Sequence, residues 1–311
     1  MGAFVHRSVL LDECIEALAI RPEGIYVDGT AGGGGHSFAI ASKLQSGKLI
    51  AIDQDEAAIA AASAKLAPLG ERALVVRSNF SKLGEVLDNL KISQIDGLLL
   101  DLGVSSYQLD EAERGFAYQN DAPLDMRMDR RRTLTAREVV NSYSEEALKK
   151  ILFTYGEERF SARIAAKIVK EREKKPIETT GELAELIKSA IPAAAREGGH
   201  HPAKRSFQAI RIEVNGELDV ILPAIESAVS HMKVGGRLAI ITFHSLEDRI
   251  VKQAFASLAG GCTCPKTLPV CVCGKKPKVK LISRKPILPS AAELEENPRS
   301  RSAKLRVAER I

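Results

Sequence analysis

Short apolar runs alternate with longer amphipathic segments over the first hundred residues of the chain. The runs have the length of strands, and the segments between them have the spacing of helices that bury one face. We predict strands at 25–28, 48–53, 73–77 and 95–101, and helices at 35–44, 55–66 and 80–90. Strands that alternate with helices in this way form βαβ units, so the pattern predicts a parallel sheet.

The pattern changes after the fourth strand. From about residue 107 the sequence becomes polar and helical, with amphipathic helices predicted at 144–153, 159–174 and 180–190. We interpret residues 107–214 as a helical domain that is inserted into an α/β domain formed by residues 1–106 and 215–311.

The α/β pattern resumes behind the insertion. We predict a helix at 217–232, a turn at Gly235-Gly236, a strand at 237–243, a helix at 246–258 and strands at 279–283 and 303–309. The last segment alternates apolar and polar residues, as an edge strand does. Two segments rich in proline and charge, 275–280 and 293–301, are predicted to be exposed loops. The whole sheet is expected to have seven strands and to close with a β-hairpin.

Composition narrows the class of protein. The chain has 311 residues, 45% of them hydrophobic, and a net charge of +5, which permits nucleic-acid binding without proving it. It contains no signal peptide and no apolar run of membrane-spanning length. We therefore expect a soluble cytoplasmic protein without a membrane partner.

Four consecutive glycines, Gly32 to Gly35, follow the first strand and its terminal Asp28. Glycines at this position let the backbone approach a nucleotide closely, and Asp53, about 20 residues on, stands where a ribose hydroxyl pair would bind. Asp28 would repel a pyrophosphate but suits the ammonium and sulfonium of S-adenosylmethionine. No Gly-Lys-Ser/Thr follows, so a phosphate-binding P-loop is disfavoured. The loop therefore favours a methyltransferase, although Thr30 replaces the first glycine of the common pattern.

Asp101 ends the fourth strand, at the edge of the sheet where ligands of open α/β folds bind. Methyltransferases that act on amino groups usually carry an acidic or Asn residue here, followed by two prolines and an aromatic. Asp101 keeps the polar head of that pattern, without the prolines. Tyr107 follows a few residues later, as a stacking face or, more commonly, as a packing residue.

Four long blocks make the resemblance to a known family specific. They are Asp101-Leu-Gly-Val-Ser-Ser-Tyr-Gln-Leu-Asp110, Pro123-Leu-Asp-Met-Arg-Met-Asp129, Pro202-Ala-Lys-Arg-Ser-Phe-Gln-Ala-Ile-Arg-Ile-Glu-Val-Asn215 and Phe243-His-Ser-Leu-Glu-Asp-Arg249. With these blocks in this order, the chain resembles the small-subunit ribosomal RNA methyltransferase H family.

The resemblance implies a fold, an activity and a set of site residues. The implied fold is the class I (Rossmann-like) S-adenosylmethionine-dependent methyltransferase fold with a helical insertion. The implied reaction is methyl transfer to N4 of a decoding-centre cytidine in 16S ribosomal RNA, in a small-subunit particle. The residues that match the family's cofactor site are Gly34, Gly35, His36, Asp53, Phe80, Asp101 and Gln108.

Transfer to an exocyclic amine requires acceptors that take its hydrogens and expose the nitrogen lone pair. Asp101, Asn215 and His244 are the catalytic candidates, in falling order. Each has a plainer interpretation. Asp101 would only hold cofactor, Asn215 would cap a helix that opens at Gly216, and His244 would cap or pack beside the segment from Ser245.

Two basic clusters in the insertion are candidates for RNA contact. Arg127, Arg130, Arg131, Arg132 and Arg137 crowd one segment, which we interpret as poorly balanced by acids and therefore as a phosphate-binding surface. The second cluster, around Lys204 and Arg205, precedes the return to the sheet. We accordingly expect the inserted domain to recognise RNA.

Four cysteines are grouped near the C-terminus. Cys262-x-Cys264 and Cys271-x-Cys273 offer four thiolates for a tetrahedral zinc ion, but zinc sites prefer at least two residues between paired cysteines. A reduced or redox-sensitive loop is an equal alternative. Cys14 lies in a predicted helix and is most simply a buried apolar residue.

Three functions compete on the sequence alone. The leading one is an RNA methyltransferase. The second is a non-catalytic RNA-binding ribosome-assembly factor with a structural adenosine cofactor. The third is an NAD-dependent oxidoreductase, which Asp28 disfavours because of its charge.

Overall fold

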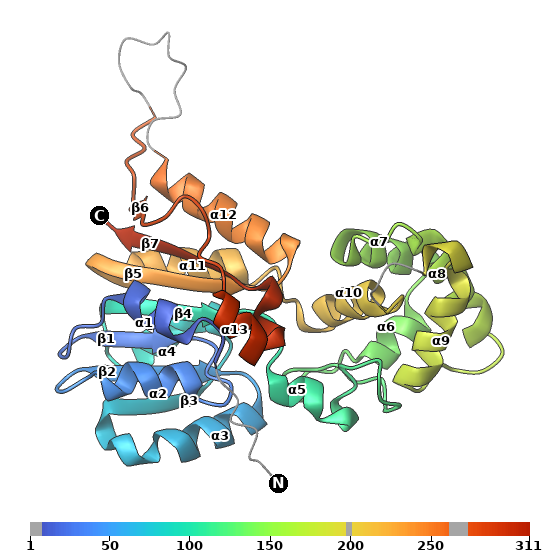
Figure 1. Cartoon of the computed structure of the whole chain (residues 1–311), viewed down its shortest axis with the longest axis horizontal. Helices are drawn as coiled ribbons and strands as arrows, with labels where there is room; N and C mark the ends of the chain where they lie inside the picture. Colours follow the sequence, from blue (N-terminus) through green and yellow to red (C-terminus); the bar gives the residue numbers. More distant parts are fainter. Residues whose placement is uncertain (1–7, 197–200, 261–272) are drawn as a thin grey trace. The chain divides into compact units, whose positions relative to one another are not determined.

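The computed structural model describes residues 8–196, 201–260 and 273–311. The chain divides into two compact units, and Figure 1 shows the elements of each. The first, the sheet unit, consists of Met1–Gly103 and Leu218–Ile311. The second, the helical unit, is Val104–Glu217.

Seven strands form one sheet in the order β3-β2-β1-β4-β5-β7-β6. They are β1 (Ile25–Asp28), β2 (Lys48–Asp53), β3 (Ala73–Arg77), β4 (Ile95–Asp101), β5 (Met232–Thr242), β6 (Val279–Leu281) and β7 (Lys304–Arg310). The first five are parallel, and β7 runs antiparallel to both β5 and β6. The predicted α/β class and the seven-stranded sheet are confirmed.

Helices cover both faces of this sheet. They are α1 (Leu11–Leu18), α2 (Gly35–Ser42), α3 (Glu56–Leu66), α4 (Leu83–Asn89), α11 (Ile221–His231), α12 (Ser245–Ala259) and α13 (Ala291–Glu296), with the short 3₁₀ helices η1 (Ala67–Arg72), η2 (Phe80–Lys82) and η5 (Pro298–Ser302). Successive strand residues point to opposite faces. Tyr26 accordingly joins the apolar cluster under α1 and α2, while Val27 joins the one under α4, α11 and α12. Cys14 of α1 is fully buried in the first cluster, as predicted.

Three details of the sheet unit differ from the prediction. Strand β7 is not an edge strand, because it bonds to β5 on one side and β6 on the other. Gly235 and Gly236 do not form a turn between elements but lie inside β5, where the register shifts between Ile95 and Gly97 of the neighbouring strand. The segment 293–301 is not an exposed loop. It contains parts of α13 and η5, and the buried Glu293 accepts a hydrogen bond from the Leu10 N–H at 2.8 Å.

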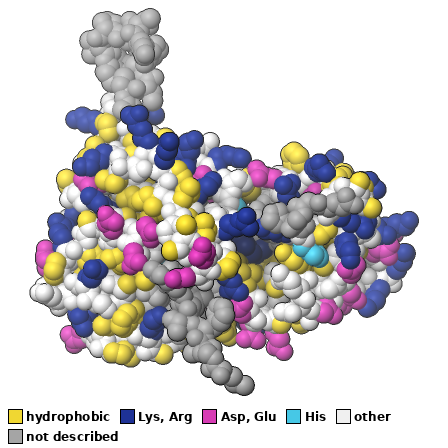
Figure 2. Space-filling model, viewed as in Figure 1, with side chains coloured by type: hydrophobic (Ala, Val, Ile, Leu, Met, Phe, Trp, Pro, Cys, Tyr) yellow, Lys and Arg dark blue, Asp and Glu magenta, His cyan; other side chains and the backbone are white. Residues whose placement is uncertain are grey.

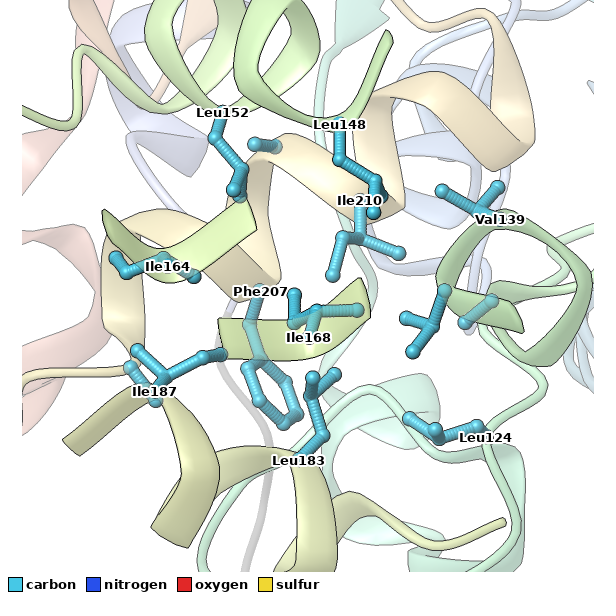
Figure 3. Close-up of a cluster of buried hydrophobic side chains, with 14 of the residues drawn as sticks. Leu124, Val139, Leu148, Leu152, Ile164, Ile168, Leu183, Ile187, Phe207 and Ile210 are labelled. Atoms are coloured by element: carbon cyan, nitrogen blue, oxygen red, sulfur yellow. The ribbon is translucent and has the colours of Figure 1, made fainter. Parts of the chain in front are cut away.

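The helical unit is built around its own apolar core. Its elements are α5 (Ser106–Asp110), η3 (Ala112–Arg114), α6 (Ala136–Ser142), α7 (Glu145–Gly156), α8 (Ser161–Arg172), α9 (Thr180–Ala190), η4 (Ala193–Ala195) and α10 (Lys204–Asn215). Figure 3 shows Leu152 of α7, Ile164 and Ile168 of α8, Ile187 of α9 and Phe207 of α10 converging in this core. An independent core of this kind can hold the unit's surface side chains in place.

Candidate cofactor site

The loop after β1 is organised by the buried Asp28. Its Oδ1 accepts the Thr30 N–H at 3.1 Å and its Oδ2 accepts the Ser37 hydroxyl at 2.6 Å. Burial raises the pKa of Asp28, and these hydrogen bonds oppose the rise. The Thr30 hydroxyl in turn accepts the Asp101 N–H at 2.6 Å, so Asp28 and Thr30 tie the ends of β1 and β4 together. Thr30 thus has a structural task that a glycine could not perform.

The four glycines have different tasks. Gly32 and Gly34 have φ angles of 50° and 76°, in the left-handed region that side chains rarely adopt. Gly35 begins α2 at a point where a Cβ would collide with the Ser8 side chain. A Cβ on Gly33 would meet no atom within 4 Å. The loop is therefore fixed by three glycines, and the fourth borders open space that a ligand can approach.

Asp53 ends β2 beside this loop. Its Oδ2 accepts the Gly32 N–H at 2.8 Å, and its Oδ1 accepts the Asp55 N–H at 2.9 Å. Burial raises the pKa of Asp53 to about 6, with a further contribution from the charges of Asp55 and Asp28. A carboxylate oxygen has two lone pairs, so each oxygen can still accept one hydroxyl, as a ribose requires.

Asp101 and His36 meet at the end of β4. The His36 Nε2 lies 2.9 Å from the Val9 carbonyl, which only accepts, so Nε2 carries a proton and Nδ1 faces Asp101 Oδ2 at 3.8 Å. The Asp101 Oδ1 is buried and has no hydrogen-bond partner among the residues that the structure describes. Burial, and then the charges of Asp28 and Glu247, raise the pKa of Asp101 well above its usual value. An unpartnered oxygen in this setting is suited to a hydrogen-bond donor or a cation.

His244 and Glu247 close the same edge of the sheet after β5. His244 is the N-cap of α12: its Nδ1 accepts the Glu247 N–H at 3.5 Å, and Glu247 accepts the Phe243 N–H at 2.8 Å. The capping interpretation of His244 is confirmed, and a catalytic role for it stays a prediction. Its Nε2 lies 3.2 Å from Glu247 Oε1 without the geometry of a hydrogen bond.

Phe80 and Gln108 are the remaining residues of the expected cofactor set. Phe80 begins η2 after the N-cap Asn79 and packs, half-buried, against the cluster under α4. A Cβ on Gly29 would lie 3.1 Å from the Phe80 Cβ. The absence of a side chain at Gly29 therefore makes room for Phe80 to pack here. Gln108 lies in the helical unit, where it forms a capping box with Ser105 at the start of α5. Contact of either side chain with a cofactor stays a prediction.

The interpretation of Asn215 as a helix N-cap is wrong. Asn215 is the last residue of α10, and Gly216 ends the helix with a φ of 62°. The buried Asn215 amide accepts the Met128 N–H at 2.8 Å and donates to the Met126 carbonyl at 2.8 Å. Met126 has a φ of 59°, which is strained for a side chain of this size. Asn215 therefore holds a strained loop of the helical unit, and a catalytic role for it stays a prediction.

The expectation that the arginine-rich segment lacks acidic partners is also wrong. Two of its arginines pair with an aspartate two positions earlier, at 2.7 Å for Arg127 with Asp125 and for Arg131 with Asp129. Arg137 pairs with Glu178 at 2.6 Å, and Arg132 donates to the Asn215 carbonyl. Much of the segment's charge is thus neutralised within the helical unit, and Arg130 keeps the best claim to contact phosphate.

The structure gathers the expected residues in two separate sets. Gly34, Gly35, His36, Asp53 and Asp101 lie at the carboxyl edge of β1, β2 and β4 in the sheet unit. Phe80 and His244 also belong to the sheet unit. The helical unit holds the other candidates for cofactor binding, RNA contact or catalysis. They are Gln108, Arg130, Arg131, Arg132, Lys204, Arg205 and Asn215.

Comparison with known proteins decides the family. Residues 3–311 match the model of the MraW methylase family. The chain belongs to the MraW methylase family. It is 57% identical over 310 residues to ribosomal RNA small subunit methyltransferase H of Brevibacillus brevis, and the match covers 99% of both proteins. It is 59% identical over 309 residues to the protein of that name from Clostridioides difficile, again over 99% of both.

The edge of the sheet fits the cofactor of this S-adenosylmethionine-dependent family. The carboxylates at this edge repel one another: the charge of Asp28 raises the pKa of both Asp53 and Asp101, and the charge of Glu247 raises the pKa of Asp101 further. A ligand that brings positive charge relieves this repulsion, and S-adenosylmethionine carries a sulfonium and an ammonium group. Asp101 Oδ1, which has no hydrogen-bond partner among the described residues, can accept a hydrogen bond from the ligand. The open space at Gly33 leaves room for the ligand to bind. The residues therefore suit S-adenosylmethionine, and the fold is that of a class I methyltransferase.

Glu247 was missed by sequence reasoning. It is 1% exposed, and its carboxylate bonds to two backbone N–H groups next to the site. Its position three residues after His244 is that of a capping-box glutamate, which was the available signal. That signal predicts the helix cap. It does not predict that the charge of Glu247 raises the pKa of Asp101, because the two residues are brought together only by the fold.

The zinc proposal falls largely outside the described residues. Cys262, Cys264 and Cys271 lie in the segment 261–272, which the structure does not describe, and only Cys273 lies beyond it. Across the three described ranges, no group of three or more His, Cys, Asp or Glu side chains is placed to hold a metal ion.

No helix within the described ranges combines the length and the apolar character needed to cross a bilayer.

Proposed function

We propose that the protein transfers the methyl group of S-adenosylmethionine to N4 of a decoding-centre cytidine in 16S ribosomal RNA, and that it acts on a small-subunit particle. The observation that carries the proposal is the unpartnered Oδ1 of Asp101 at the carboxyl end of β4. The names of the relatives, which act on ribosomal RNA of the small subunit, support the choice of substrate.

An amine such as cytidine N4 is a poor nucleophile because its lone pair is delocalised into the ring. The cofactor supplies an electrophilic methyl group. Asp101 Oδ1 accepts a hydrogen from N4, which draws the nitrogen toward tetrahedral geometry and exposes the lone pair. Reaction needs N4 about 3 to 3.5 Å from the methyl carbon and in line with it. Positioning by the protein is therefore the main part of the catalysis.

The reaction also releases a proton. As the bond from N4 to the methyl carbon forms and the carbon–sulfur bond breaks, N4 becomes positively charged and must lose one hydrogen. The ionised Asp101 carboxylate accepts that proton, and its raised pKa makes it a better base than an ordinary aspartate. His36 Nδ1 lies 3.8 Å from Asp101 Oδ2, and a proton on this nitrogen would favour the ionised form of Asp101 before transfer.

The test is methylation of defined particles. Small subunits from a strain that lacks this gene are incubated with the protein and labelled S-adenosylmethionine, and the RNA is digested and mapped by mass spectrometry. We expect one new N4-methylcytidine in particles and much less in naked 16S RNA. Binding to particles without methyl transfer, under conditions in which the cofactor binds, would instead favour a non-catalytic assembly factor.

A further inference from the structure

An exposed histidine ring lies flat on a tyrosine in the helical unit. The rings of His201 and Tyr118 stack with their centroids 4.4 Å apart and 14° between their planes. Tyr118 is half-buried, whereas His201 is exposed. A ring stacked in this way on one side, in an exposed residue, offers a flat surface to a further aromatic group.

Contacts with the core and with the backbone fix the positions of the Tyr118 and His201 rings. Tyr118 meets the buried Phe207 edge-on, with centroids 5.6 Å apart and an angle of 83°. Phe207 belongs to the core of the helical unit, where Figure 3 shows it between α8 and α9. The His201 Nδ1 accepts the Ala203 N–H at 3.2 Å, which fixes the ring's orientation. Such preorganisation lowers the entropy lost when a ligand stacks on the ring.

Two cations follow the ring closely in the sequence. Lys204 and Arg205, the first two residues of α10, are both exposed, and Arg205 donates to the Glu157 carbonyl at 2.9 Å. Cations in the first turn oppose the helix dipole, so helix stability does not account for them. The α8–α9 surface differs. Figure 2 shows basic and acidic side chains mixed there, and Lys174 pairs with Glu171 at 3.0 Å.

We propose that His201 is a stacking platform for one unpaired base of RNA, with Lys204 and Arg205 contacting the phosphates beside that base. Aromatic faces next to cations are the usual means of holding single-stranded nucleic acid. This inference rests on the proposed function, because it takes RNA as the substrate. It assigns to the helical unit the recognition of an unpaired stretch of the substrate RNA.

The competing explanation is that the stack only stabilises the fold. Packing needs no exposed ring, because the core already holds Phe207 and Tyr118 from the other side. Two complementary variants separate the explanations. His201→Phe keeps a flat ring and loses the acceptor for Ala203, whereas His201→Asn keeps an acceptor and loses the ring.

The experiment measures binding of full-length protein to a short, unstructured polyuridine RNA over a range of salt concentrations. Loss of one stacked base weakens affinity by roughly ten-fold or more and leaves the salt dependence unchanged, because no phosphate contact is lost. We expect this result for His201→Asn and near-parental affinity for His201→Phe. Lys204→Ala should lower the salt slope by about one, and the matched control Lys174→Ala should not.

Parental affinity for His201→Asn, with an unchanged melting temperature, would overturn the platform. So would equal weakening by His201→Phe and His201→Asn, because that would assign the effect to the fold. The outcome is separable from that of the proposed function. Methylation of particles by the parent, with no effect of His201→Asn on RNA affinity, removes only the platform. RNA binding through His201 without any N4-methylcytidine removes only the proposed reaction.

Discussion

His36 Nδ1 lies 3.8 Å from Asp101 Oδ2, while Nε2 of the same ring lies 2.9 Å from the Val9 carbonyl. The ring thus connects the N-terminal segment to the end of β4 through the first turn of α2. Since Nε2 keeps its proton for Val9, a second proton on the ring must sit on Nδ1, where it faces the Asp101 carboxylate. The ionisation of the two side chains is therefore coupled.

Asp101→Asn should lower methyl transfer to small-subunit particles by roughly 10²-fold or more, because the amide cannot act as a base. Since the raised pKa of Asp101 delays its ionisation, parental activity should rise with pH as the carboxylate ionises, and the variant should lose that rise. Single-turnover rates across pH, with S-adenosylmethionine affinity measured by calorimetry, check this. A variant that loses only cofactor affinity would assign Asp101 to cofactor binding alone.

His36→Gln should shift the rising limb of the parental pH profile to higher pH. If the ring carries a proton on Nδ1 when Asp101 ionises, glutamine removes that positive charge, and the pKa of Asp101 should then rise further. The maximal rate at high pH should change much less than in Asp101→Asn. An unshifted limb, in a variant with normal cofactor affinity, would show that the two groups do not titrate together.

Asp53→Asn should weaken S-adenosylmethionine binding and remove a pH dependence from the stability of the cofactor-free protein. A charge-assisted hydrogen bond to a ribose hydroxyl contributes roughly 1.5 to 3 kcal/mol, or about ten-fold to a hundred-fold in affinity. The folded pKa of about 6 exceeds the unfolded value of about 3.9, so the folded protein holds its proton longer and loses stability as pH rises from about 4 to 6. The variant avoids this loss.

The measurement for Asp53→Asn is thermal unfolding without cofactor between pH 4 and pH 7, a window set by these two pKa values. The stability of the variant relative to the parent should rise as the pH increases from about 4 to 6 and stay constant above that. Constant differences across the range would mean that Asp53 is not titrating there. Comparison with the parent cancels the other titrating groups.

The strands could be predicted from the sequence because burial on both faces of a parallel sheet requires uninterrupted apolar runs. The bounds of β1, β2 and β4 agree with those predicted. The place of β7 could not be predicted in this way. Alternation along a strand reports which face is buried, whereas the pairing of its edges depends on strands elsewhere in the chain.

The residues of the candidate site likewise fall into those that local sequence patterns predict and those that depend on distant contacts. Asp53 and Asp101 could be found because each ends an apolar run, and the fold then brings such ends to one edge. The pairing of Arg137 with Glu178 joins residues 41 positions apart, which no local pattern reports. The amide of Asn215 bonds to a loop residue 89 positions earlier, a structural role that no local pattern reports.

Gly33→Ala and Gly34→Ala form a matched pair within the cofactor loop. Gly33→Ala should leave the melting temperature unchanged, because the new Cβ meets no atom within 4 Å, but it should weaken S-adenosylmethionine binding by entering the open space. Gly34→Ala forces a Cβ into a left-handed residue and should cost roughly 1 to 2 kcal/mol of stability. Parental cofactor affinity in Gly33→Ala would mean that the ligand binds elsewhere.

Arg130→Ala and Arg131→Ala should differ in their effect on RNA binding, although the two residues are adjacent and both exposed. The Arg131 side chain is held by Asp129 at 2.7 Å, so we expect it to make no phosphate contact and its removal to leave the salt slope close to that of the parent. Arg130→Ala removes a cation that forms no ion pair with the described residues, so the salt slope of RNA binding should fall by about one. Salt titrations of both variants with the same RNA check this. Equal slopes for Arg130→Ala and the parent would remove the segment from the RNA interface, because Arg127, Arg132 and Arg137 are already engaged within the helical unit.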